Sequence, residues 1–282
     1  MRPIARYAAY VALMVVTGLL SSGLVTFAIS GVVAMQLAPE GTEFTEAMSA
    51  FISSDTPLVL ALGIVPTSLA FAIIALIVTR GRREELRFWS APPLDFVIGS
   101  VGMIAVSTAA GALVSLLGLV DNGALAKLND IFSNMTWDVR LLMLPVTAIG
   151  PGVSEELFFR GFVLGKGQRV VGTTAAVIIS ALAFGAVHVD PGHVIAASLM
   201  GGYLAFVVLR TGSLWVTIVA HVMNNALATL APELNGTGAT DRMESVIGLI
   251  AGVAVGALMV LVMVRRHPMP DRTPAPPPPP DL

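Results

Sequence analysis

The sequence predicts an all-α protein, a polytopic membrane helix bundle with about eight transmembrane helices. Two observations lead to this prediction: 55% of the 282 residues are hydrophobic while only 12% are charged, and the mean hydropathy is +0.84. Soluble domains carry roughly 25% charged residues, so an ordinary soluble domain is excluded. The lipid bilayer is the expected surrounding, no nucleic-acid partner is expected, and the oligomeric state is left open.

Several apolar stretches are long enough to cross, or nearly cross, a bilayer, which takes about 20 helical residues at 1.5 Å rise each. We expect helices near residues 8–37, 56–79, 93–120, 141–165, 171–189, 193–209, 213–231 and 245–264. The first stretch is too long for a signal-peptide core, and we interpret it as a retained helix. The fifth to seventh stretches are short and closely spaced, so we expect them to be tight antiparallel neighbours.

Lysine and arginine are concentrated on one side of this topology. Of the 16 basic residues, only Lys127, Arg140 and Arg242 lie opposite the N-terminal side. Because basic residues mark the cytoplasmic side of membrane proteins, both termini are predicted to be cytoplasmic. The absence of organelle signals favours a multi-pass protein of a bacterial plasma membrane.

The hydropathy pattern divides the chain into four segments. They are N-terminal transmembrane helices and loops at 1–140, core helices with the polar motifs at 141–231, a C-terminal transmembrane helix at 232–267, and a proline-rich tail at 268–282. Proline lacks the amide hydrogen that helices and sheets need, so the tail is predicted to be disordered.

The first polar motif lies inside an apolar run, with Glu155, Glu156 and Arg160 between Leu141 and Leu164. Ionisable groups inside a membrane segment are costly, so an intramembrane site is the default hypothesis. Positions four apart share a helix face, so Glu156 can pair with Arg160 while Glu155 points about 100° away, towards a cavity. An ion-paired packing network is the alternative interpretation of this motif alone.

Two further motifs place histidines in apolar helices. Phe184 and His188 share a face of one helix, and His221 and Asn225 share a face of another. Glu155 and His188 are equally far in sequence from the basic turn between them, so an antiparallel hairpin would bring them to one level. Each motif alone also fits a plain packing or hydrogen-bonding role.

The depths of the two histidines disagree in this scheme. His221 lies about 12 Å into its helix, whereas His188 lies about 25 Å into its own. Of the other histidines, His193 is a further ligand candidate but is expected to cap the next helix at the interface, and His267 is expected to be solvated. The chain contains no cysteine, which excludes disulfides, thiolate ligands and a cysteine nucleophile.

In order, Glu-Glu-x-x-x-Arg, Phe-x-x-x-His and His-x-x-x-Asn each occupy a separate apolar helix. This combination resembles the CAAX-protease and bacteriocin-processing (CPBP, or Abi) family of intramembrane endopeptidases, which includes the type II CAAX prenyl endopeptidases. The resemblance covers about residues 150–230. It implies a hydrolase that cleaves a peptide or protein substrate in or at the membrane, as in CAAX-box protein processing or bacteriocin processing.

The resemblance also implies roles for residues of this chain. Glu155 would activate a water molecule that His188 shares. The site would be completed, and the oxyanion stabilised, by His221 and Asn225. Structural support would come from Glu156, Arg160 and Phe184.

The participation of a metal is open at this point. Glu155, His188 and His221 could form a zinc site with an open position for water, and a metal would give neutral histidines in a dry site a partner. Against this, no two of the three ligands share a helix. We favour metal-free water activation, with zinc as the alternative cofactor.

Other functions can be weighed on the same residues. The sequence contains no His-Glu-x-x-His, which disfavours the zinc proteases that use it. The alternative from another class is a membrane transporter that uses the buried Glu/Arg/His cluster as a relay, with the Gly150-Pro151-Gly152 break as its broken helix. The lack of a second, similar half argues against a transporter.

Overall fold

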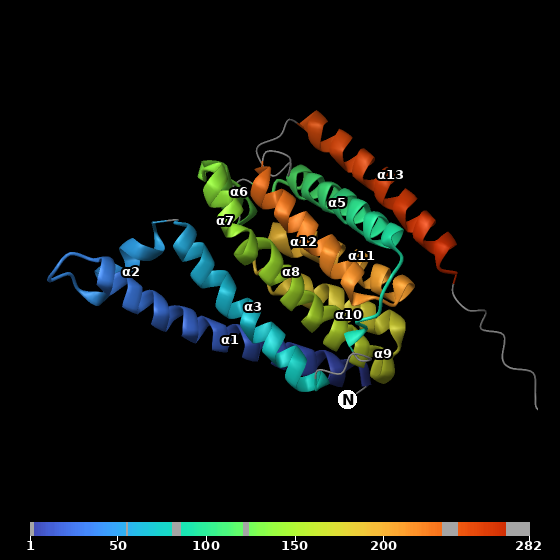
Figure 1. Ribbon diagram of the computed structural model, residues 1–282, viewed down its shortest axis with the longest axis horizontal. Helices are drawn as coiled ribbons and strands as arrows, with labels where there is room; N and C mark the ends of the chain where they lie inside the picture. The colour runs from blue at the N-terminus through green and yellow to red at the C-terminus, as the bar shows by residue number, and fades with distance from the viewer. Residues whose placement is uncertain (1–2, 55, 81–85, 121–123, 233–241, 269–282) are drawn as a thin grey trace, which may run out of the picture.

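The computed structural model describes residues 3–54, 56–80, 86–120, 124–232 and 242–268, and every regular element within these ranges is a helix (Figure 1). Six helices are long and apolar enough to cross a membrane, and two shorter apolar helices accompany them. The two shorter helices correspond to the fifth and seventh predicted stretches. The predicted all-α, polytopic membrane bundle is therefore confirmed.

The first half of the chain forms two outer helices, a more buried helix and two short ones. In chain order its elements are α1 (Pro3–Leu37), α2 (Phe44–Ile52), α3 (Pro57–Thr79), α5 (Pro93–Leu116) and α6 (Ala124–Asn134). α1 packs against α3, and both present large apolar side chains outward, as helices that face lipid do. The short helices α2 and α6 were not predicted, because neither is long enough to give a transmembrane pattern.

A single composite helix, Trp137–Val171, runs through the middle of the fold. Its parts are α7 (Trp137–Leu144), the π-helical segment η1 (Pro145–Ile149), α8 (Gly150–Glu155), the π-helical segment η2 (Glu156–Leu164) and α9 (Gly165–Val171). It extends beyond the predicted 141–165 at both ends. Pro145 and Pro151 lack the N–H that an α-helical ladder needs, and π-helical turns are often found at functional sites.

The last four helices complete the bundle. They are α10 (Thr173–Ala186), α11 (Pro191–Thr211), α12 (Leu214–Leu230) and α13 (Arg242–Arg266). α13 packs along α5, and a side chain at Gly252 would meet the carbonyl oxygen of Ala105 at 2.6 Å, so glycine permits the close approach.

The predicted hairpin between the first and second motif helices is present. α9 ends at Val171 and is followed by Gly172, whose φ of +82° glycine adopts without strain. α10 then returns beside η2, where the Ser180 hydroxyl donates to the Phe159 carbonyl oxygen at 2.8 Å. Glu155 and His188 thereby reach the same part of the bundle.

The disagreement in histidine depth is resolved by where α12 begins. Leu214 starts this helix fully buried and close to Gly161, which is halfway along η2. The backbone N–H of Leu214 donates to the Arg87 carbonyl oxygen at 2.9 Å. The first residue of α12 is therefore hydrogen-bonded, inside the protein, to the segment that precedes α5. α12 therefore starts at depth, and His221 is level with the glutamates.

Basic side chains gather at the end of the bundle that carries the N-terminus. Lys166 lies 3.4 Å from the Tyr10 hydroxyl, and Arg87 hydrogen-bonds Gln168. This agrees with the predicted charge segregation, while the cytoplasmic location of the termini and the four-segment division stay predictions. Of the predicted tail, 268–282, only Pro268 is among the described residues.

Candidate active site

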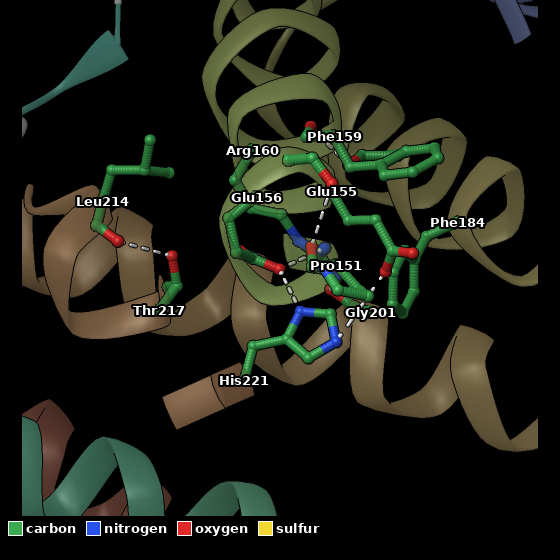
Figure 2. Close-up of polar contacts among 12 residues, drawn as sticks. Pro151, Glu155, Glu156, Phe159, Arg160, Phe184, Gly201, Leu214, Thr217 and His221 are labelled. Carbon is green, nitrogen blue, oxygen red and sulfur yellow. Dashed lines mark hydrogen bonds and ion pairs between the residues drawn. The ribbon is translucent and has the colours of Figure 1, made fainter. Parts of the chain in front are cut away.

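The two adjacent glutamates have different surroundings. Glu156 begins η2 with a fully buried side chain, and its Oε1 lies 2.7 Å from Nη1 of the equally buried Arg160 (Figure 2). Glu155, the last residue of α8, keeps 16% of its side chain exposed and lines a cavity. The predicted Glu156–Arg160 pair, and the different facing of Glu155, are both present.

The guanidinium of Arg160 is held from three sides. Besides Glu156, it donates through Nη2 to the carbonyl oxygen of Gly201 on α11 at 3.1 Å, and it lies 4.4 Å from the centre of the Phe184 ring. A Cβ at position 201 would come within 3.2 Å of Nη2 and 3.0 Å of Phe184, so glycine leaves room for this contact. Hydrogen bonds from Nη1 and Nη2 and a cation–π contact thus compensate much of the cost of burying this charge, while Nε has no partner among the described residues.

His221 connects the two glutamates. Its Nδ1 lies 3.0 Å from Oε1 of Glu156, and its Nε2 lies 3.8 Å from Oε2 of Glu155 (Figure 2). With the proton on Nδ1, the neutral ring donates to Glu156 and presents the lone pair of Nε2 towards Glu155. A Cβ at Gly152 would meet Val222 at 2.6 Å, so this glycine lets α8 and α12 approach closely enough for the contact.

A cavity of about 360 Å³ opens beside this cluster. Polar side chains from several helices line it, among them Glu155, His188, His193, His221, Asn224, Asn225 and Thr229. All four residues predicted as catalytic therefore share one cavity. Their catalytic roles stay predictions, and the ring nitrogen within 4 Å of Glu155 belongs to His221.

The second motif supplies an aromatic bridge between the histidines. The Phe184 ring makes edge contacts with the rings of His188 and His221, at centroid distances of 5.3 and 5.6 Å. Nδ1 of His188 lies 2.9 Å from the Phe184 carbonyl oxygen, so a proton on Nδ1 leaves Nε2 as the lone-pair nitrogen. Phe184 therefore positions both imidazole rings and the guanidinium of Arg160.

His193 has a different place from the one expected. The cap of α11 is Asp190, whose Oδ1 accepts from the His193 backbone N–H at 2.9 Å. The His193 ring lines the cavity and lies 4.1 Å, centre to centre, from that of His188. The sequence did not predict this position, because it depends on the turn at 187–190, which places His193 beside His188 although they are five positions apart.

The placement of these side chains does not fit a zinc site. Within the part of the chain that is described, no three histidine, aspartate or glutamate side chains are close enough together to hold one metal ion. The candidate ligands Glu155, His188 and His221 line the same cavity, but their side chains are not close enough together to bind one metal ion. No mechanistic step is therefore derived through a metal.

The fold and this site define a class: a polytopic helical membrane protein with a buried glutamate–arginine–histidine cluster beside a polar cavity. Residues 136–227 match the family described as "Type II CAAX prenyl endopeptidase Rce1-like", so the resemblance seen in the motifs is confirmed over this segment. It reaches from the residue before α7 to within α12 and includes every residue of the cluster.

A relative points the same way. The Bacillus subtilis (strain 168) protein named "Putative membrane peptidase YdiL" is 34% identical over 92 residues, which are 33% of this chain and 37% of that protein. No solved structure gives a significant match to the chain. The matches support a membrane peptidase at the level of the family.

Proposed function

We propose that this protein is a membrane-embedded endopeptidase in which Glu155 and His221 together activate the attacking water. The observation that carries the proposal is the bridge made by His221, which is anchored on Glu156 at 3.0 Å and faces Glu155 at 3.8 Å. That gap is too long for a direct hydrogen bond, but a water about 2.8 Å from each atom would contact both.

The division of labour follows from the contacts. Glu156 is neutralised by Arg160 and holds the His221 ring, so it acts as a positioning residue. Among the described residues, Glu155 forms no ion pair with an arginine or lysine, and it lines the cavity, which suits a group that must accept a proton. His221 Nε2 would orient the water by accepting a hydrogen bond from it.

The reaction is then a direct hydrolysis. The water oxygen attacks the carbonyl carbon of the scissile peptide bond while one water proton passes to Glu155, giving a tetrahedral oxyanion. Asn225, which lines the same cavity, has amide N–H groups suited to stabilise that oxyanion. Breaking the C–N bond requires a proton on the leaving nitrogen, which Glu155 returns directly or through His188.

The test compares membrane proteomes. Cells would produce the wild type, Glu155→Gln, or Glu46→Gln, the same change at an exposed position on α2. We expect new protein N-termini in membranes that contain the wild type or Glu46→Gln, and none that depend on the Glu155→Gln variant. Identical products from wild type and Glu155→Gln would refute the role of Glu155, and no products from any variant would refute the peptidase.

A further inference from the structure

The outer wall of the cavity is formed by α6, at the end of the bundle away from the N-terminus (Figure 1). α6 contacts α11 and α12, the two helices that supply His193 and His221. Leu128, Asn129 and Phe132 lie on the cavity side of this short helix, whereas Lys127 and Asp130 are exposed. Leu128 and Asn129 lie four and three positions before Phe132, a spacing that places each of them on the same helix face as Phe132.

Asn129 is the polar residue of this wall. Its Oδ1 is buried and has no hydrogen-bond partner among the described residues. A buried amide oxygen without a partner is unfavourable, and an unpaired one at a cavity is suited to receive a donor from a bound molecule. The position of this acceptor therefore points to a ligand in the cavity.

The rest of the cavity suits an extended apolar peptide. Apolar side chains line it beside the polar ones: Leu60, Ile64, Leu128, Phe132 and Met200. Further carboxamides and hydroxyls line it as well, from Asn224, Asn225, Thr67, Ser68 and Ser107. The mixture offers apolar surface to side chains and both donors and acceptors to a main chain.

A peptide segment needs such groups before it can be cleaved in this environment. The scissile bond must leave any helical conformation to admit the water, and the freed backbone N–H and C=O groups find little water inside a membrane. Side-chain amides can replace the lost intrahelical partners. An acceptor for a peptide N–H is therefore useful among the side chains that line the cavity, and Asn129 is one of them.

We propose that Asn129 binds the substrate main chain, its Oδ1 accepting a hydrogen bond from a peptide N–H near the scissile bond of an extended apolar segment. The inference rests on the proposed peptidase function and names the substrate class of that site. It makes α6, a helix outside the three sequence motifs, part of the substrate-binding surface.

The first experiment separates binding from chemistry. A peptide pool from trypsin-digested bacterial membranes is offered to the purified protein, and the peptide cleaved fastest is used to measure KM and kcat. Asn129→Leu keeps the side-chain size and removes the acceptor, so we expect KM to rise about five- to tenfold with kcat nearly unchanged. The control is Asn134→Leu, at an exposed position of the same helix, which should behave as wild type.

The second experiment does not depend on cleavage. The chain has no native cysteine, so Asn129→Cys and Asn134→Cys can each be labelled with N-ethylmaleimide in a Glu155→Gln background. Saturating peptide pool should slow labelling at position 129 several-fold and leave position 134 unchanged. Protection at 129 would support the inference even if the wild type cleaved nothing.

The outcomes separate the two proposals. If the wild type cleaves and Asn129→Leu matches Asn134→Leu in KM, with no protection at position 129, the binding role is overturned while the peptidase stands. If there is neither cleavage nor protection, both are overturned. A loss of kcat alone in Asn129→Leu would also contradict a role in substrate binding.

Discussion

Two regions of this protein hold the same three residue types, a carboxylate, an arginine and a histidine, in different settings. In the middle of the bundle Glu156 binds Arg160 and His221. Where α13 ends beside the start of α5, a second cluster is built on Asp95. Its Oδ1 lies 3.0 Å from Nε of Arg266, and its Oδ2 lies 2.8 Å from Nε2 of His267.

The central carboxylate of each cluster is fully buried, and the difference lies in the burial of the cations and in what stands beside each cluster. Arg160 is fully buried, while Arg266 and His267 keep 31% and 24% of their side chains exposed. The central cluster also has a second carboxylate, Glu155, facing the cavity. Residue types alone therefore do not mark a site. The second cluster acts as a clamp that joins α13 to α5, whereas the first orients a histidine towards a reactive group.

The largest expected effect on stability is that of Arg160→Ala. Removing the guanidinium leaves the buried Glu156 carboxylate without its cation, which should lower the free energy of unfolding by about 3–5 kcal/mol. Arg266→Ala should cost clearly less, because the Arg266 side chain is partly exposed to solvent and His267 remains beside Asp95. Thermal melting in detergent measures both losses of stability. Equal losses in the two variants would contradict the claim that the central cluster depends more strongly on its arginine.

A double change tests whether Glu156 and Arg160 act as one unit. Glu156→Gln combined with Arg160→Ala should be less harmful than the sum of the single changes, with a coupling of about 0.5–3 kcal/mol. Additive losses in the same melting assay would show that the 2.7 Å contact carries no net interaction.

A smaller effect is expected from salt. Raising the ionic strength to about 0.5 M should reduce the difference in melting temperature between wild type and Arg266→Ala, since exposed charges are screened. The difference for Arg160→Ala should persist because water and ions do not reach it. The same salt dependence in both variants would argue that Arg160 is solvated.

The smallest effect is expected from metal removal. Dialysis against a strong chelator, with elemental analysis to verify the loss of zinc, should leave peptide cleavage unchanged within the error of the assay. Loss of activity that stoichiometric zinc restores would instead show that Glu155, His188 and His221 converge on a metal during the reaction.

Local spacing predicted part of this arrangement. The pairing of Glu156 with Arg160 follows from positions four apart on a helix, and the shared cavity of Glu155 and His188 follows from a hairpin of equal arms. Both depend only on contacts near in sequence or on helix length, which the sequence displays directly.

Other contacts depend on tertiary structure. The contact of His221 with Glu156 requires α12 to begin inside the bundle. There its first residue, Leu214, is hydrogen-bonded to Arg87, which is distant in sequence. His267 was expected to be solvated and instead binds Asp95, 172 positions earlier. No periodicity in the sequence records such long-range pairings.

The most direct test compares Glu155→Gln with Asp95→Asn in one purified preparation, measuring kcat for a cleaved peptide and the melting temperature of each. Glu155→Gln should lower kcat about 10²- to 10⁴-fold with the melting temperature of the wild type. Asp95→Asn should melt earlier and keep its kcat. Wild-type cleavage by Glu155→Gln, or a parallel loss of activity and stability in both variants, would contradict the assignment of catalysis to the central cluster.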